Sequence, residues 1–225
     1  MEAGDAVTGA ARRARLASAR LYLIVGEASC REPWEAAVAR ALASGAVDLV
    51  QLREKALDDA AFVARAARLR ALLPAGGPLL LVNDRVHLVA ACGADGVHVG
   101  EDDLPPEEAR RRLGDDLLVG VSTHDAAEVA AAGRRGADHA GLGPCFPSRT
   151  KALARRPEGA ALVRACLPVA TVPVFPIGGI TAANVGDLVA AGATRAAVGA
   201  GILGADDPAA AARAIADVLS GTAGA

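Results

Sequence analysis

Short apolar runs alternate with longer stretches of helical period along most of the chain. Runs rich in Leu, Val and Ile are typical of strands that are buried on both faces. We expect strands at residues 21–25, 47–53, 79–82, 96–99, 117–121, 139–143, 172–177 and 195–199. Helices are expected at residues 33–43, 58–73, 85–92, 105–112, 125–134, 157–167, 181–190 and 207–219.

Local signals support several helix boundaries. Asp58, Asp125 and Thr181 stand at helix starts, where a side-chain oxygen can accept from a free backbone N–H. A Gly-Ala pair recurs shortly before four of the strands, and glycine often ends a helix. These pairs occupy residues 45–46, 93–94, 136–137 and 192–193.

Eight consecutive strand–helix units indicate a parallel sheet covered by helices. Eight repeats favour an α/β fold of the closed (β/α)8 type, a TIM barrel, with parallel strands and outer helices. A flavodoxin-like or Rossmann sheet is the alternative, but no GxGxxG motif follows the first strand. We expect residues 20–225 to form one catalytic barrel domain and residues 1–19 to form a flexible tail or a short helix.

Composition narrows the classes of partner. Apolar residues make up 52% of the 225 residues, so a sizeable core is expected. A net charge of −2 and only 2% aromatic residues argue against a nucleic-acid-binding or membrane-surface protein. The four cysteines form no CxxC pair, and no signal peptide or long apolar span is evident. A cytoplasmic enzyme with small-molecule partners is therefore expected, and a homo-oligomer remains open.

In a TIM barrel the active site lies at the carboxyl ends of the strands. The second strand ends in the sequence QLREK. Side chains alternate along a strand, so Gln51, Arg53 and Lys55 should share one side while Leu52 and Glu54 take the other. Burying two cations requires an anionic partner. The alternative is a solvated strand end whose charges pair with neighbouring side chains.

Acidic and amide side chains follow the third and fourth strands. Asn83 and Asp84 come directly after the third, and Asp103 lies in the loop after the fourth. Each alone could simply cap a helix. Together, Asp84 and Asp103 could hold one Mg²⁺, which is typically bound by one or two carboxylates plus substrate phosphate oxygens.

The remaining loops add hydroxyl groups, a lysine and glycines. Ser122 follows the fifth strand, and the segment GLGPCFPSRTK at residues 141–151 follows the sixth. Glycine-rich turns follow the seventh and eighth strands, which is the usual place for a phosphate in this fold. The pattern predicts two anion sites: one for a diphosphate with magnesium and one for a monophosphate. His87, His98, His139 and Cys145 are interpreted as structural, with His98 facing the interior.

The motifs QLREK, NDR, ADGVHVGEDD, GVSTH, GPCFPSRTK and IGGIT, in this order, resemble those of the thiamine phosphate synthase family. The resemblance implies a TIM-barrel transferase that joins 4-amino-2-methyl-5-hydroxymethylpyrimidine diphosphate to 4-methyl-5-(2-phosphoethyl)thiazole or its carboxylate. The products would be thiamine phosphate and pyrophosphate. In the family, loss of diphosphate gives a pyrimidine methylene cation that the thiazole nitrogen traps.

The resemblance also implies roles for individual residues. Catalytic roles fall to Arg53, Lys55, Ser122 and Lys151, and Mg²⁺ binding falls to Asp84 and Asp103. Substrate contacts fall to Gln51, Arg53, Lys55, Asn83, Ser122, Ser148, Thr150, Lys151, Gly179, Gly199 and Ala200. The family often has Thr at the position of Ser148, which keeps the hydroxyl group. It commonly has Ser at the position of Ala200, so one side-chain donor to the thiazole phosphate is missing here.

Two alternatives have different chemistry. A thiazole tautomerase-like barrel can share the REK and NDR motifs and a histidine near His124. Such an enzyme releases no diphosphate and has no evident need for Asp103 or for the Ser148–Lys151 segment. A barrel that binds phosphate without catalysis is the second alternative.

Overall fold

Eight parallel strands form one sheet whose order follows the chain, in a computed structural model that describes residues 8–147 and 157–221. The strands are β1 (Leu21–Val25), β2 (Leu49–Leu52), β3 (Leu79–Asn83), β4 (Gly96–Val99), β5 (Leu118–Thr123), β6 (His139–Leu142), β7 (Val174–Pro176) and β8 (Ala196–Val198). β1 pairs with both β2 and β8, and a parallel bridge between Ile177 and Ala197 joins the two ends of the sheet. The predicted (β/α)8 barrel is confirmed.

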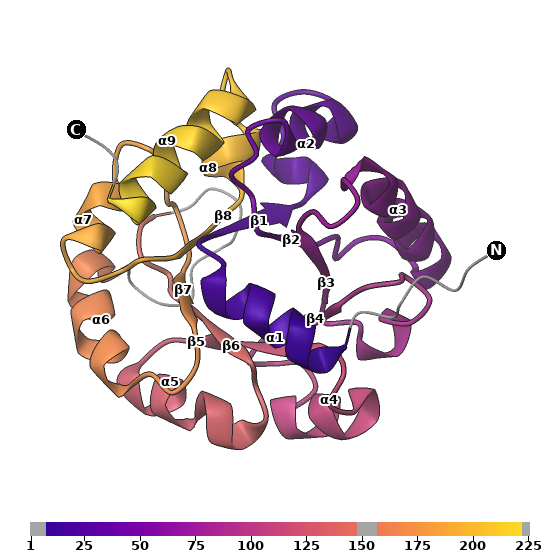
Figure 1. Ribbon diagram of the computed structural model, residues 1–225, viewed down its shortest axis with the longest axis horizontal. Coiled ribbons are helices and arrows are strands. Elements are labelled where there is room, and N and C mark those ends of the chain that lie inside the picture. The colour runs from indigo at the N-terminus through magenta and orange to yellow at the C-terminus, as the bar shows by residue number, and fades with distance from the viewer. Residues whose placement is uncertain (1–7, 148–156, 222–225) are drawn as a thin grey trace.

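Helices surround the strands on the outside (Figure 1). They are α2 (Trp34–Leu42), α3 (Asp59–Leu72), α4 (Pro106–Leu113), α5 (Ala126–Ala132), α6 (Gly159–Cys166), α7 (Val185–Val189), α8 (Ala200–Leu203) and α9 (Pro208–Ser220). Short 3₁₀ turns are η1 (Glu27–Ser29), η2 (Val86–Leu88), η3 (Gly133–Arg135) and η4 (Leu167–Val169). The predicted caps Asp58 and Asp125 are confirmed, since each side chain accepts from a backbone N–H three residues on.

Alternation along the strands divides the core into two parts. Outward-facing residues such as Leu23, Val50 and Leu52 belong to the large cluster between strands and helices. Inward-facing residues such as Leu49 and Leu81 form a smaller cluster inside the barrel. This division follows from the period of two in a strand, and it makes the barrel interior a packed core rather than a channel.

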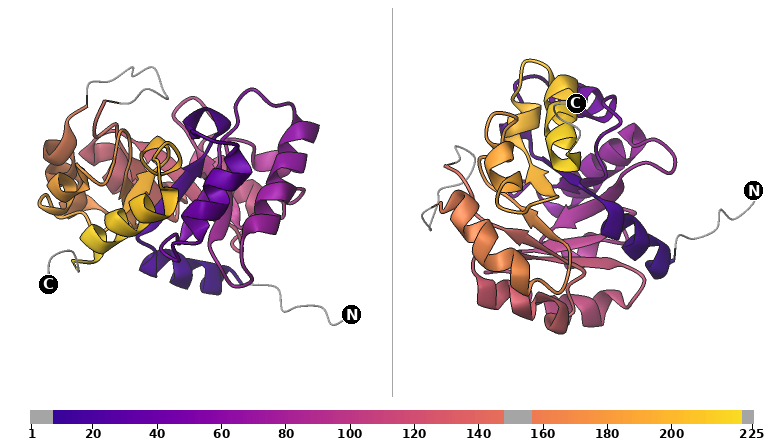
Figure 2. Two further views of the ribbon diagram at one scale, coloured as in Figure 1. Left: turned by 90° about the horizontal axis from the view of Figure 1, so that it is seen from above. Right: turned by 60° about the vertical axis from the view of Figure 1, so that its left-hand side comes forward.

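The helix α1 (Gly9–Ser18) closes the amino-terminal end of the barrel. It crosses this end in Figure 1 and lies below the strands in the left view of Figure 2. Leu16 and Ala19 are buried and belong to the cluster inside the barrel. The carboxyl-terminal end of the barrel, opposite α1, therefore remains as the end where a site can open.

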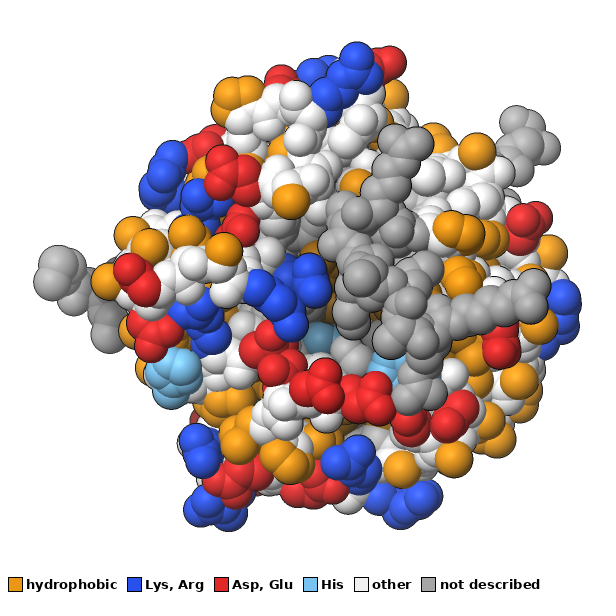
Figure 3. All heavy atoms as spheres, turned by 180° about the vertical axis from the view of Figure 1, so that it is seen from behind, with side chains coloured by type: hydrophobic (Ala, Val, Ile, Leu, Met, Phe, Trp, Pro, Cys, Tyr) orange, Lys and Arg blue, Asp and Glu red, His pale blue; other side chains and the backbone are white. Residues whose placement is uncertain are grey.

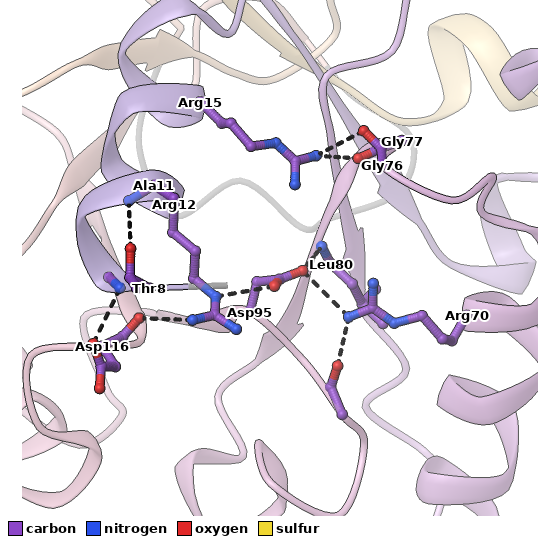
Figure 4. Close-up of polar contacts among 12 residues, drawn as sticks. Thr8, Ala11, Arg12, Arg15, Arg70, Gly76, Gly77, Leu80, Asp95 and Asp116 are labelled. Atoms are coloured by element: carbon purple, nitrogen blue, oxygen red, sulfur yellow. Dashed lines mark hydrogen bonds and ion pairs between the residues drawn. The ribbon is translucent and has the colours of Figure 1, made fainter. Parts of the chain in front are cut away.

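Arginines of α1 bind acidic and carbonyl groups that precede the strands (Figure 4). Arg12 Nε lies 3.0 Å from Asp95 Oδ1, while the other oxygen of Asp95 accepts from Leu80 N–H at 2.9 Å and from Arg70 at 3.2 Å. Arg15 donates to the carbonyl of Gly77. Asp95 thus links α1, α3 and the start of β3. These contacts fix the position of α1 against the amino-terminal end of the barrel.

Two predicted helices differ from the structure. The helix expected at 85–92 is wrong, because only η2 and irregular turns connect β3 to β4. Asp84 there has a positive φ of 62°, and the Arg85 side chain is held by the Leu57 carbonyl, so the chain turns sharply instead of entering a helix. The helix expected at 181–190 begins only at Val185, since Asn184 accepts from Thr181 N–H and donates to Gly179 O, which forms a turn first.

Within the ranges that the structure describes, no helix is both long and apolar enough to cross a membrane.

Candidate active site

Figure 3 shows the end of the molecule opposite α1, where the carboxyl ends of the strands meet. Basic side chains gather near the centre of this face, and a band of acidic side chains lies directly beside them. Histidine side chains are visible in the hollow between them. Opposite charges therefore meet at the mouth of the barrel, as expected for a site that takes a charged ligand and a cation.

The end of β2 places its side chains as alternation predicts. Gln51 faces the interior and is buried, and its Nε2 donates to the hydroxyl of Tyr22 at 2.6 Å. Glu54 takes the opposite side, where it accepts from Glu27 N–H at 2.6 Å and pairs with Arg65 at 3.2 Å. The half-buried Arg53 makes no ion pair with any described residue, so its charge is available to an anion.

Lys55, Asn83 and Asp84 line one small pocket at the mouth. Lys55 Nζ lies 3.2 Å from Asp84 Oδ2. Asn83 Nδ2 donates to Asp84 Oδ1 and, at 3.2 Å, to the carbonyl of His98. Asn83 Oδ1 is buried and has no hydrogen-bond partner among the described residues. An acceptor left unpaired in a pocket is a cost that a bound donor group would remove.

The two acidic residues after β3 and β4 interact directly. Burial, and then the hydrogen bond and charge of Asp103, raise the pKa of Asp84 to about 6. Burial alone would raise the pKa of Asp103 as well, but the hydrogen bonds from Asp84 and from Gly100 N–H (2.8 Å) lower it below its usual range. Below about pH 6 the pair therefore holds one proton between its two carboxyl groups, which is typical of acids that share a site.

This pair fits a divalent cation such as Mg²⁺. A bound cation would remove the repulsion between the carboxylates of Asp84 and Asp103, and in acid it would displace the proton that they share. No group of three or more His, Cys, Asp or Glu side chains that could hold a metal occurs in the described parts of the chain. Two carboxylates suffice for Mg²⁺, because waters and substrate oxygens complete its coordination.

Ser122 lies at the end of β5 and lines a second pocket together with Gly100 and Asp103. Its Oγ is 3.2 Å from Nε2 of His98, which reaches up from the barrel interior. The hydroxyl is thus placed between the buried core and the same loop that carries Asp103. A ligand at the mouth can contact Ser122 and a cation held by Asp103 together.

The loops after β6, β7 and β8 lie against one another. Gly179 has a φ of 62°, and a Cβ on it would lie 2.3 Å from the carbonyl of Pro147. A Cβ on Gly201 would lie 2.0 Å from the carbonyl of Ile180. Gly199 precedes α8, whose first residue is Ala200. Glycine is therefore required where these loops touch, and Gly179, Gly199 and Ala200 are brought to one side of the mouth.

Three of the expected site residues, Ser148, Thr150 and Lys151, lie outside the described residues. Among the described residues before them, Phe146 donates its backbone N–H to Gly178 O at 2.9 Å. Cys145 and Phe146 thus lie next to the loop after β7. Cys145 is buried, as predicted for a packing residue.

The barrel interior carries a polar layer that sequence reasoning missed in part. His98 and His139 are buried side by side, with Nδ1 of His98 3.3 Å from Nε2 of His139. Tyr22 packs edge-on against His139, with ring centroids 5.7 Å apart. A Cβ on Gly120 would lie 2.2 Å from His139, so this glycine provides the space for the rings. Alternation along the predicted strands was the signal that could have found this layer.

His124, at the start of α5, is held by acidic side chains. Its Nδ1 lies 3.1 Å from Glu128 Oε2 and 4.0 Å from Glu101 Oε2. Its backbone N–H also donates to Glu128 at 2.7 Å. Through these contacts His124 connects the loop after β5 to α5, which is a structural role.

Comparison with known proteins agrees with this arrangement. A family model described as thiamine monophosphate synthase matches residues 21–202. A thiamine-phosphate synthase from Anaeromyxobacter dehalogenans is 46% identical over 212 residues, which are 94% of this chain and 92% of that protein. One from Gloeobacter violaceus is 46% identical over 201 residues, which are 89% of this chain. The match covers 58% of the length of that second protein.

A solved structure has the same fold along its whole length. The thiamine phosphate pyrophosphorylase from Pyrococcus furiosus superposes with a TM-score of 0.81 and 29% sequence identity, covering 95% of this chain and 100% of that one. The family model covers all eight strands and all the described site residues. The chain therefore belongs to the thiamine monophosphate synthase family, whose members are transferases of thiamine biosynthesis.

Proposed function

We propose that this chain joins 4-amino-2-methyl-5-hydroxymethylpyrimidine diphosphate to 4-methyl-5-(2-phosphoethyl)thiazole, or its carboxylate, to give thiamine phosphate and pyrophosphate. The observation that carries the proposal is the contact of Lys55 with Asp84 at the barrel mouth, in a chain of this family. A cationic and an acidic side chain at one edge of the mouth suit a diphosphate substrate with a bound metal ion, because Lys55 can bind the diphosphate and Asp84 the metal ion. A thiazole tautomerase can share the REK and NDR motifs that supply this contact, but it releases no diphosphate and has no evident need for Asp103, which interacts with Asp84 here.

The diphosphate would be held on the β2 and β3 side of the mouth. Arg53 and Lys55 would donate to its oxygens there, Asn83 lines the same pocket as Lys55, and Lys151 adds a further cation. Asp84 and Asp103 would hold Mg²⁺, which neutralises charge on the departing diphosphate. The guanidinium of Arg53 is half-buried and has no acidic partner among the described residues. A bound anion would offset the free-energy cost of burying this charge, which supports the role of Arg53 in binding the diphosphate.

The pyrimidine ring would lie above the interior polar layer. Because Gln51 donates an N–H to Tyr22, its amide oxygen remains as an acceptor for the 4-amino group. Ser122 stands on the other side of the mouth, from β5, and contacts the ring or its diphosphate. These two side chains would orient the methylene carbon toward the thiazole nitrogen, which traps the pyrimidine methylene cation after the diphosphate has departed.

The thiazole phosphate would occupy the side formed by the last three loops. Backbone N–H groups at Gly179, Gly199 and Ala200 suit a phosphate, since glycine allows it a close approach. Ser148 and Thr150 add hydroxyl groups. Ala200 supplies no side-chain donor, so the backbone and the hydroxyls carry the binding.

The cytoplasmic location and the lack of nucleic-acid and membrane partners stay predictions, as does any homo-oligomer.

A direct assay tests the proposal. The purified protein is incubated with both phosphorylated heterocycles and Mg²⁺, and the two products are separated chromatographically. Thiamine phosphate and pyrophosphate are expected only when both substrates are present. Binding of the pyrimidine diphosphate without either product would support the non-catalytic barrel instead, and conversion of a thiazole isomer alone would support the tautomerase.

A further inference from the structure

The buried pair His98–His139 forms a chain of hydrogen bonds that ends on Ser122. His139 Nε2 lies 3.3 Å from His98 Nδ1, and His98 Nε2 lies 3.2 Å from Ser122 Oγ. The far nitrogen of the chain, His139 Nδ1, is buried and has no hydrogen-bond partner among the described residues. Three consecutive polar groups thus run from the apolar core to the mouth of the barrel.

Burial in the barrel interior, with no acidic hydrogen-bond partner among the described residues, favours the neutral form of both rings. Burial, helped for His98 by the neighbouring His139, lowers the pKa of His98 to about 3, and burial lowers that of His139 to about 4. A neutral imidazole has one N–H donor and one acceptor nitrogen. The direction of one hydrogen bond in the chain therefore determines the direction of the next.

The unpaired nitrogen decides between the two directions. If His98 donated from Nδ1 to His139, the proton of His139 would sit on Nδ1, as a buried N–H with no acceptor. If His139 donates from Nε2, its Nδ1 carries only a lone pair. The His139 ring itself packs edge-on against the rings of Tyr22 and Phe175, whose centroids are 5.7 and 5.8 Å from that of His139. Orphaned buried N–H groups are rarer than under-satisfied acceptors, so the second direction is favoured.

We infer that His139 is a positioning residue: it donates to His98, His98 in turn donates from Nε2 to Ser122, and the hydroxyl proton of Ser122 is left to donate to a bound ligand. The ligand group is thereby an acceptor, and a pyrimidine ring nitrogen or a diphosphate oxygen meets this requirement. That identification rests on the proposed function, whereas the direction of the hydrogen bonds does not.

The direction can be measured without any substrate. Long-range ¹H–¹⁵N correlation spectra of the ¹⁵N-histidine-labelled protein at neutral pH report which nitrogen of each ring carries the proton. We expect both His98 and His139 as neutral rings protonated on Nε2. A proton on Nδ1 of either ring would overturn the inference, even if the enzyme proves to be a thiamine-phosphate synthase.

Variants of His139 test the effect on Ser122. His139→Phe removes the donor, so His98 should no longer hold one protonation form, and the KM for the pyrimidine diphosphate should rise about tenfold, the scale of one lost hydrogen bond. His139→Gln places an amide N–H where Nε2 was, and it should restore both the spectrum of His98 and the KM. An equal rise in both variants would overturn the inference.

Phe175→Leu is the matched packing control, since it alters the same ring cluster without touching the hydrogen bonds. It should leave the protonation of His98 and the KM close to wild type. A rise in KM as large as that of His139→Phe would show that packing alone is responsible and would overturn the inference. If the wild type makes no product, the proposed function fails while the spectra still decide the direction.

Discussion

The ammonium nitrogen of Lys55 lies 3.2 Å from Oδ2 of Asp84, at the edge of the barrel mouth. The lysine side chain is 61% exposed and the aspartate side chain 22% exposed, so the lysine lies on the solvent side of the pair and the aspartate on the pocket side. In this contact the ammonium group of Lys55 and the carboxylate of Asp84 neutralise each other. When a diphosphate and Mg²⁺ bind together, Lys55 can turn to the anion and Asp84 to the cation, so the pair is ready to separate without leaving either charge buried alone.

Mg²⁺ binding should weaken in acid. The pKa of Asp84 is raised to about 6 by burial and by Asp103, so its carboxyl is protonated below that pH and ionised above it. Mg²⁺ must displace this proton, and its affinity should fall about tenfold per pH unit below 6. Calorimetric titration of the protein with Mg²⁺ between about pH 5 and pH 7.5 measures this. An affinity independent of pH over this range would contradict the assignment.

Asp103→Asn should impair use of Mg²⁺. Losing a ligand should raise the Mg²⁺ concentration for half-maximal activity by about tenfold or more. Asp102→Asn is the matched control, because Asp102 is an exposed acid on the same loop, one residue earlier. The two variants are compared by Mg²⁺ titration of the rate of pyrophosphate release. Equal shifts in the two variants would mean that loop charge, and not ligation, is responsible.

Arg53→Met should lower turnover by about a hundredfold, the scale of removing one strong electrostatic contact in a site. The free energy of unfolding should change little, since Arg53 has no ion pair with the described residues. Arg110→Met provides the contrast. Arg110 pairs with Asp138, an acid before β6 whose side chain is 10% exposed, and loss of this pair should cost about 1–3 kcal/mol of stability with kcat preserved.

Steady-state kinetics and urea unfolding of both arginine variants check this. If Arg53→Met were fully active, or lost activity only because it unfolds, the role of Arg53 in binding the diphosphate would be wrong.

Leu16→Ala should destabilise the barrel by about 2–4 kcal/mol, because Leu16 of α1 is 2% exposed and fills the amino-terminal end of the interior. Val169→Ala is the control, since Val169 is 42% exposed and its truncation should stay within about 0.5 kcal/mol of wild type. Equilibrium unfolding in urea measures both. A wild-type midpoint for Leu16→Ala would show that α1 does not contribute to the closed end.

Local patterns predicted most of the fold. Each of the eight strands lies within two residues of its expected boundaries, because strands buried on both faces give continuous apolar runs. Alternation also placed Gln51 inward and Glu54 outward, since the period of a strand is fixed by its geometry.

Contacts between segments far apart in the sequence could not be predicted from these patterns. The left-handed φ of Asp84 and the hydrogen bond from Gly100 that holds Asp103 bring two acids together from different loops. The packing of Leu16 into the barrel depends on the interior that all eight strands create. Neither can be derived from periodicity or capping, because both depend on distances between elements.

The most direct test of the central claim is a phosphorus NMR time course of the protein with both heterocycles and Mg²⁺. We predict that thiamine phosphate and pyrophosphate appear together in a one-to-one ratio, as the signals of the pyrimidine diphosphate and the thiazole phosphate decline. Unchanged signals of both substrates, with folded protein that has bound Mg²⁺, would contradict the account.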